Sequence, residues 1–318
     1  MARRLRPTAN CSLLTAHCLL PIAFRLFICI LIASALTSNA TAQTSAQRLR
    51  LAVLDFGEST TGRRAADKLS SALFSAKEFS AIDRDESRAA ARGAGYNGSL
   101  NMTLQEARDL GGAIGCDFFL TGDAQTLRRS SFARPVYYEA YASIFIVSAR
   151  TGRLVLWDRP AFEAAAADEA EKSLLDELTL RAARYVEVIR AALFAERAER
   201  AQMIERASAE APLIEDAPED EAAAAREHIR LPQPYRRLRP AYPETAARAD
   251  AEATVDVRLE IDAEGEVARV EVVRWAGFGL DEAAVATVRQ LHFRPATRDG
   301  APVPIRVLLR YNFRRPPK

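Results

Sequence analysis

The sequence contains little cysteine and histidine: of its 318 residues, four are cysteine and three are histidine. Three of the cysteines lie within the first 42 residues, at Cys11, Cys18 and Cys29, and Cys116 is the one thiol of the remaining chain. A single thiol forms neither an intramolecular disulfide nor a cysteine zinc site. We therefore expect no metal site, and we interpret Cys116 as a small buried hydrophobic residue.

Motifs for cofactor binding are missing as well. The chain has no Gly-x-x-x-x-Gly-Lys phosphate loop and no Gly-x-Ser-x-Gly nucleophile elbow. Gly93, Gly95 and Gly98 form a Gly-x-Gly-x-x-Gly pattern, which binds a dinucleotide where it joins a strand to a helix. Here it follows the helix-like residues 87–92 and precedes the polar residues 99–103, so we interpret it as an interhelical loop and expect no cofactor.

Candidate catalytic groups are few and scattered. Cys116 would have to meet His228 or His292 across domains to form a nucleophile and base. Asp55 and Asp123 follow predicted strands and are the one carboxylate pair we nominate for acid–base chemistry, although pairs of this kind arise by chance in so acidic a chain. We expect a protein that is not an enzyme.

The charge of the chain gives no sign of a nucleic-acid partner. Lysine and arginine number 44 against 42 aspartate and glutamate residues, but four arginines, Arg3, Arg4, Arg6 and Arg25, lie in a first segment of 42 residues without acids. Subtracting these four leaves 40 basic residues against 42 acidic ones in the rest of the chain. That balance is not the footprint of a DNA- or RNA-binding surface.

Residues 1–42 have the three regions of a secretory signal peptide. Arginines come first, the apolar residues 26–36 follow, and the small-residue pattern Ala40-Thr41-Ala42 predicts cleavage before Gln43. The alternative is an uncleaved membrane anchor over Leu13–Leu36. Three residues that are costly in lipid interrupt that segment, namely His17, Pro21 and Arg25. Either fate predicts export, to the periplasm of a Gram-negative bacterium or to the outer face of its inner membrane.

Residues 48–206 alternate between strand and helix patterns. Residues 51–54 are a continuous apolar run typical of a strand buried on both faces. Thr103 and Glu106 have the spacing of a capping box, which predicts a helix start, and 136–147 with 154–157 read as a hairpin. A long helix with one apolar face closes this part. The pattern predicts a mixed α/β sandwich with a partly antiparallel sheet.

Residues 207–228 shift to alanine, acids and proline. Six acids and no base occur from Glu210 to Glu221. We interpret the segment as a solvated linker, and an acidic docking segment is the alternative.

Residues 229–318 have the clearest pattern. Residues 254–261 alternate polar and apolar, a turn around Gly265 follows, and 267–274 predict the returning strand of a hairpin. Leu280, Ala284, Val288 and Leu291 mark one face of a helix. Alternation resumes over 305–313, so we expect a small antiparallel sheet backed by a helix.

Residues 236–314 resemble the C-terminal domain of the TonB family. The resemblance rests on ordered landmarks: Pro240-Ala241-Tyr242-Pro243-Glu244 and Ala246, Gly265–Val267, Gly279-Leu280-Asp281 and Ala284, Phe293-Arg294-Pro295-Ala296, and Gly300 with Pro302 and Val303. Arg239 and Leu291 stand where the family commonly has Gln and Trp. A full TonB protein has a Ser and a His four residues apart in its membrane anchor, whereas Ser12 and His17 are five apart here. It also has a long proline-rich spacer before the C-terminal domain, whereas the spacer of this chain is short and acidic.

The resemblance implies a periplasmic protein that binds a peptide or protein at the outer membrane and supports TonB-type transmembrane transport as an energy transducer. The partner would be an outer-membrane receptor or another envelope protein, held by strand addition at a sheet edge. Inner-membrane motor proteins would be further partners if the leader is an uncleaved anchor. Arg306 and Arg310 would lie on one face as candidates for selecting an acidic peptide, and ordinary solvated arginines are the alternative. The implied partner-binding residues are Arg239, Tyr242, Pro243, Val303, Ile305, Arg306, Val307, Leu309, Arg310, Tyr311 and Phe313.

The N-terminal half resembles the α/β domains of the CsgG and TolB N-terminal type. The resemblance rests on Leu51–Phe56, on Gly115–Gly122 and on the hairpin through Thr151-Gly152. It implies envelope assembly rather than chemistry. The alternative function is therefore a non-enzymatic assembly or scaffold factor led by this half, in which the C-terminal domain serves to form a homo-oligomer.

Overall fold

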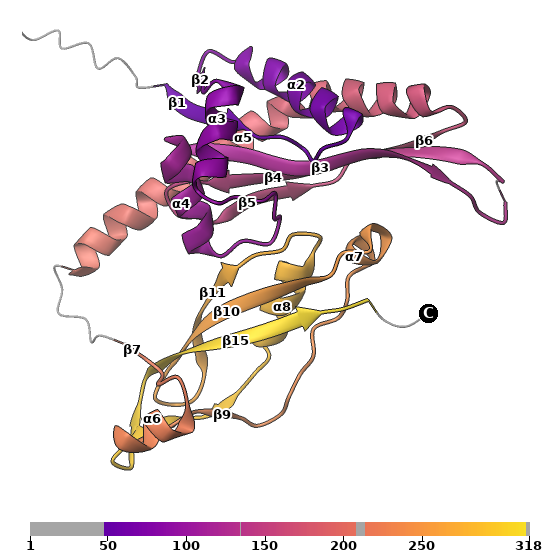
Figure 1. Cartoon of the computed structure of the whole chain (residues 1–318). Coiled ribbons are helices and arrows are strands. Elements are labelled where there is room, and N and C mark those ends of the chain that lie inside the picture. Colours follow the sequence, from indigo (N-terminus) through magenta and orange to yellow (C-terminus); the bar gives the residue numbers. More distant parts are fainter. Residues whose placement is uncertain (1–47, 134, 208–213, 316–318) are drawn as a thin grey trace, which may run out of the picture. The chain divides into compact units, whose positions relative to one another are not determined.

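The computed structural model describes residues 48–133, 135–207 and 214–315. The predicted leader lies outside these ranges. Contacts group the chain from Arg48 onward into one unit. The order of its elements follows the alternation expected from the sequence, with a mixed α/β part first and a mainly antiparallel part after it (Figure 1).

The first part is built on a mixed sheet in the order β2-β1-β3-β4-β5, with β6 pairing β4. Strand β1 is parallel to both of its neighbours, β2 and β3, whereas β3, β4, β5 and β6 pair antiparallel. The strands are β1 (Leu49–Val53), β2 (Phe79–Ala81), β3 (Phe118–Arg129), β4 (Tyr137–Ser148), β5 (Leu154–Asp158) and β6 (Ala161–Ala164). The predicted mixed α/β class is confirmed.

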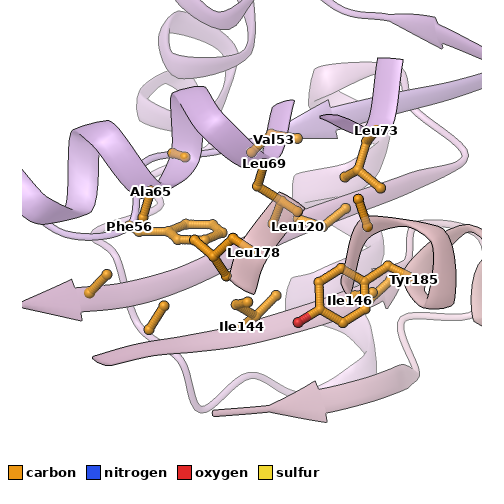
Figure 2. Packing of buried hydrophobic residues seen from close by; sticks show 14 of the residues in the cluster. Val53, Phe56, Ala65, Leu69, Leu73, Leu120, Ile144, Ile146, Leu178 and Tyr185 are labelled. Carbon is orange, nitrogen blue, oxygen red and sulfur yellow. The ribbon is translucent and has the colours of Figure 1, made fainter. Parts of the chain in front are cut away.

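Helices cover both faces of this sheet, because β1 carries apolar residues on both. Leu51 and Val53 face one core with α2 and α5, and Ala52 and Leu54 face a second core with α3 and α4. Figure 2 shows Leu69 and Leu73 of α2 and Leu178 and Tyr185 of α5 converging on Leu120, Ile144 and Ile146 of the sheet. The helices are α2 (Thr60–Phe74), α3 (Arg84–Gly93), α4 (Leu104–Ile114) and α5 (Ala167–Ala207).

The capping box predicted for α4 is present. The Thr103 hydroxyl accepts the Glu106 amide at 3.1 Å, and the Glu106 carboxylate accepts the Thr103 amide at 2.6 Å. Gly115 ends the helix at φ +73°, a left-handed conformation that suits glycine. Two earlier glycines, Gly111 and Gly112, lie inside the helix. A Cβ on Gly111 would lie 2.3 Å from Ala149 Cβ, so this glycine permits close packing.

The second part is a four-stranded sheet in the order β11-β10-β15-β7, backed by α8. The strands β10 (Ala253–Ile261), β11 (Val267–Arg274) and β15 (Ile305–Phe313) are antiparallel, and β7 (Glu215–Asp216) joins in parallel. The helices are α6 (Glu221–Arg226), α7 (Glu244–Ala249) and α8 (Leu280–Val288). Short pairs complete it: β9 (Gln233–Pro234) with β12 (Phe293–Arg294), and β13 (Ala296–Arg298) with β8 (Ile229–Arg230) and β14 (Ala301–Val303). The predicted antiparallel sheet backed by a helix is confirmed.

Trp275 connects the second part to the core of the first. Its indole is 1% exposed, and Nε1 donates to the carbonyl of Gly152 at 3.0 Å. Asn101 donates through its side-chain amide to the carbonyls of Thr254 and Trp275 at 2.9 and 2.6 Å. The sequence pattern predicted two domains joined by a linker, and nothing in it predicted this buried contact.

Within the described ranges, no helix has both the length and the apolar composition needed to cross a membrane. Cys116 is partly buried against the α3–α4 core, and burial raises the pKa of its thiol to about 12.

We expect Asp281 to make folding depend on pH. Burial raises the pKa of this carboxyl from 3.8 to about 7, although it accepts the amides of Ala276 and Gly277 at 2.9 and 2.8 Å. Because the folded state then binds the proton more tightly than the unfolded state, stability is lost as pH rises from about 4 to about 7.

Between pH 6 and 7, the free energy of unfolding should fall by roughly 1 kcal/mol more in the native chain than in Asp281→Asn. Urea denaturation at both pH values measures this. Glu264→Gln, at an exposed turn position, is the control and should keep the native pH dependence. Parallel pH profiles for the native chain and Asp281→Asn would refute the assignment.

Candidate peptide-binding edge of the C-terminal sheet

The candidate site is built on β15, whose nine residues all pair with β10. The register runs from Ile305 opposite Ile261 to Phe313 opposite Ala253. Successive side chains of a strand point to opposite faces, so odd-numbered residues face the α8 core and even-numbered residues face outward. The exposure pattern of β15 follows this alternation.

The other edge of β15 is covered only at its start. There β7 pairs in parallel, with Ile305 opposite Glu215 and Arg306 opposite Asp216, and the Ala217 amide donates to the Arg306 carbonyl at 2.7 Å (Figure 1). Alternate residues of a strand direct their backbone groups to the same edge. The backbone groups of Leu308 and of the outward residues after it, Arg310 and Asn312, therefore face this edge. In the described part of the chain no strand pairs with β15 there beyond Arg306.

The acidic segment before this domain is therefore not simply the solvated linker expected from the sequence. Asp216 contacts Arg306 at 3.2 Å, and Glu215 contacts Arg298 at 2.5 Å. The physical reason is charge complementarity combined with main-chain pairing, which a composition pattern does not reveal. These two acids thus contact the folded domain of their own chain.

The two arginines predicted to select an acidic peptide have acids of their own chain as partners. Arg310 forms a bidentate pair with Asp256, with distances of 2.7 and 2.9 Å, and these bonds raise the pKa of Arg310. Arg306 contacts Glu260 at 3.2 Å. Asp256 is only 3% exposed and also lies 3.4 Å from Arg274 Nε.

Sequence reasoning missed Asp256, Glu260 and Asp216. The first two were detectable in principle, because they alternate outward on β10 with the same spacing of four that separates Arg306 and Arg310 on the antiparallel strand. Asp216 carried no such signal, since its pairing with Arg306 joins segments 90 residues apart.

Leu308 is also part of the outward face. Its side chain is 55% exposed, between Arg306 and Arg310 along the strand. Leu308 is absent from the partner-binding residues that the resemblance implied. An exposed leucine flanked by arginines gives this face both an apolar and a basic character.

The predicted binding strand began two residues too early. Val303 lies in β14, where it pairs with Ala296, and Pro304 separates it from β15. Proline lacks the amide hydrogen that a central strand needs, so it ends one strand and lets the next begin. Val303 is thus part of the β13–β14 hairpin rather than of the edge.

The apolar residues predicted for the site face the core. Ile305 and Phe313 are buried, and Val307, Leu309 and Tyr311 are half-buried. Burial raises the pKa of Tyr311. These side chains hold β15 in place, and the backbone and outward face are what the strand offers to a partner.

Arg239, Tyr242 and Pro243 precede and begin α7. Tyr242 donates through its hydroxyl to the Ala251 carbonyl at 2.8 Å and packs against the α8 core, and Pro243 is the residue before the first turn of α7. Arg239 is exposed. Tyr242 and Pro243 therefore also fit a purely structural role, because proline is common at the start of a helix.

The remaining sequence candidates each have partners of their own. Asp55 pairs with Arg88, and Asp123 accepts the Tyr141 hydroxyl at 2.9 Å. His292 contacts Glu266 at 2.9 Å. A search of the residues that the structure describes finds no group of three or more His, Cys, Asp or Glu side chains placed to hold a metal ion.

Comparison with protein families supports the predicted resemblance of the C-terminal part. Residues 239–314 match the family described as the Gram-negative bacterial TonB protein C-terminal, which confirms the resemblance predicted for residues 236–314. The match indicates an envelope-associated, protein-binding domain type over these residues. A comparison with curated protein sequences gives no match.

Several solved structures are similar to parts of the chain. The TonB C-terminal domain of Pseudomonas aeruginosa is 20% identical, covering 27% of this chain and 89% of its own, with a TM-score of 0.24. The LpoB C-terminal domain of Salmonella enterica is 16% identical, covering 42% and 92%, with a TM-score of 0.26. The hypothetical protein CT253 of Chlamydia trachomatis is 10% identical, covering 42% and 95%, with a TM-score of 0.31. Similarities at this level do not indicate a function.

Asp256 should be the most sensitive residue of the outward face. Asp256→Asn removes the charge that Arg310 and Arg274 share, and we expect the free energy of unfolding to fall by about 2 kcal/mol. Asn312→Ala, on the same face of β15, is the control and should change stability much less. Denaturant titration of each variant measures the difference, and equal effects would show that Asp256 has no special role.

Proposed function

We propose that the C-terminal domain binds an extended peptide of a cell-envelope protein by adding it as a strand to the edge of β15. The observation that carries the proposal is the edge itself. Beyond Arg306, the backbone groups of Leu308, Arg310 and Asn312 face a side of β15 that no described strand occupies. Unpaired strand edges supply main-chain hydrogen bonds to an incoming peptide.

The chain's own β7 indicates the chemistry of the partner. It is acidic, it runs parallel to β15, and Asp216 reaches Arg306 across the edge. A partner peptide with the same direction would continue along β15 toward Phe313. Its acidic side chains would meet Arg306 and Arg310, and an apolar one would cover Leu308.

The resemblance of residues 236–314 to the TonB family supports the cell compartment and the class of partner in this proposal. The protein works in the periplasm, and the partner is an outer-membrane receptor or another envelope protein whose transport function it serves. The domain binds and does not catalyse. Cleavage of the leader before Gln43 would make the protein a free adaptor, whereas an uncleaved leader would attach it to the inner membrane and its motor proteins.

A photo-crosslinking experiment tests the edge. A photoreactive phenylalanine analogue at Leu308 or Asn312, in the full chain expressed in a Gram-negative host, should form adducts with an envelope protein. The same analogue at Ala286, exposed on α8, is the control and should form none. Adducts from Arg269 on β11, at the opposite edge of the sheet, with none from Leu308, would contradict the proposal.

The docked acidic segment should compete with the partner. Replacing Glu215 and Asp216 with alanine removes their contacts with Arg298 and Arg306 and frees the start of the edge. We expect the yield of the Leu308 crosslink to rise at least about threefold, because an intramolecular competitor is weakened.

The matched control replaces Glu205 and Glu219, two exposed acids outside β7, with alanine. It removes the same charge and should leave the yield unchanged. A yield that rises equally in both double variants would reflect net charge, and a yield that does not rise would show that β7 does not compete.

A further inference from the structure

The α/β part has a topological switch point between β1 and β3. From β1 the chain passes through α2 to β2 on one side, and then through α3 and α4 to β3 on the other side of β1. The helices α2 and α3 consequently lie on opposite faces of the sheet. In open α/β sheets, a crevice forms outside the carboxyl ends of the strands at such a point, and ligands bind there.

A cavity of about 900 Å³ occurs at this place. Leu54 and Asp55, which directly follow β1, line it, and so does Tyr96, whose hydroxyl lies 2.8 Å from Thr121 Oγ1 of β3. The volume lies within the range of small-molecule sites. Nothing assigned so far to this chain uses the cavity.

Arginines dominate its charge. Four of them line the cavity against two acids, Asp55 and Glu58, which gives the lining a net charge of +2. The arginines are Arg63, Arg84, Arg88 and Arg92.

Asp55 is already engaged by two of these arginines. It accepts Arg88 Nε at 2.7 Å and Nη2 at 3.0 Å, and it lies 2.9 Å from Arg84 Nη2. The hydrogen bond from Arg88 is the main cause of a lowered pKa, so Asp55 stays charged. It neutralises part of the arginine charge and orients Arg88.

Arg84 also pairs through Nη1 with Asp67, whereas the two remaining arginines have no acidic partner in the described part of the chain. Among the described residues, neither Arg63 nor Arg92 forms an ion pair, and Arg63 donates only to the Glu58 carbonyl and, at 3.5 Å, to Thr60 Oγ1. Arg84 Nε is buried without a hydrogen-bond acceptor in the same part of the chain. Buried donors normally have acceptors, so this atom favours a ligand that supplies one.

The start of α2 adds to the positive potential. Glu58 and Arg63, on either side of this start, both line the cavity. The first turn of α2 contains no acid, and its cap is the neutral Ser59 hydroxyl, which accepts the Gly62 amide at 2.7 Å. Of the Gly-x-Gly-x-x-Gly residues, Gly93 ends α3, and Gly95 and Gly98 lie in the predicted loop between α3 and α4, where Gly98 reaches the cavity wall at φ +87°.

We propose that this cavity binds a phosphate-bearing small molecule. The phosphate lies among Arg63, Arg84 and Arg92, since planar guanidinium groups bind phosphate oxygens well. The less polar part of the ligand lies on Leu54 and Tyr96. The site is separate from the β15 edge, so either proposal stands if the other fails.

Calorimetric titration of the purified full chain with inorganic pyrophosphate at low salt tests the site. We expect saturable binding that weakens at least about tenfold when Arg63 and Arg92 are both replaced with alanine, because two charge-assisted contacts are lost. Arg200→Ala, at an exposed position of α5, is the control and should bind as the native chain does. Arg92→Gln alone, at an exposed position, gives a milder variant in case the double variant does not fold.

Sedimentation with phosphatidylglycerol vesicles distinguishes a free ligand from a lipid headgroup. Pyrophosphate binding without vesicle binding supports a free phosphorylated compound, and vesicle binding that pyrophosphate reverses supports a headgroup in the same site. Absence of saturable binding to both probes would overturn the proposal. A loss of binding in Arg200→Ala as large as in the double variant would also overturn it, because the interaction would then be non-specific.

Discussion

The continuous pairing of β10 with β15 is the constraint on which the C-terminal domain depends. It fixes which side chains of β15 enter the α8 core and places Asp256 and Glu260 opposite Arg310 and Arg306. It also occupies one edge of β15 completely, so any further strand has to join on the other edge. A shift of one residue would reverse the two faces and bury the arginines.

Much of the fold was predictable because its signals are local. The capping box of Thr103 and Glu106, the apolar run of β1 and the alternation along β10 and β15 all gave elements of the right type. The residues at which strands begin and end were less well predicted. Pro304 separates Val303 from β15, and the resemblance had placed Val303 in the binding strand. The contact of Trp275 with Gly152 depends on tertiary packing, which leaves no periodic pattern in the sequence.

The candidate site was predicted only in outline. The resemblance implied the strand that became β15, and alternation along it placed Arg306 and Arg310 on one face. The sequence could not show that acids of the same chain already pair with both arginines, nor that Glu215 and Asp216 dock on the strand. Those contacts form between segments far apart in sequence, and their register is set by folding. The arginine cavity was missed for the same reason, because Arg63 and Arg92 come from different helices.

The covalent attachment of β7 to the strand that it covers sets a threshold for recognition. A segment on the same chain acts at an effective concentration that, for short flexible connections, is of millimolar order. A free peptide therefore displaces it only if it binds much more tightly or is itself concentrated at a membrane surface. Peptides that merely carry negative charge gain little, because β7 already offers that charge. The domain would thus respond to local abundance of its partner rather than to every acidic strand it meets.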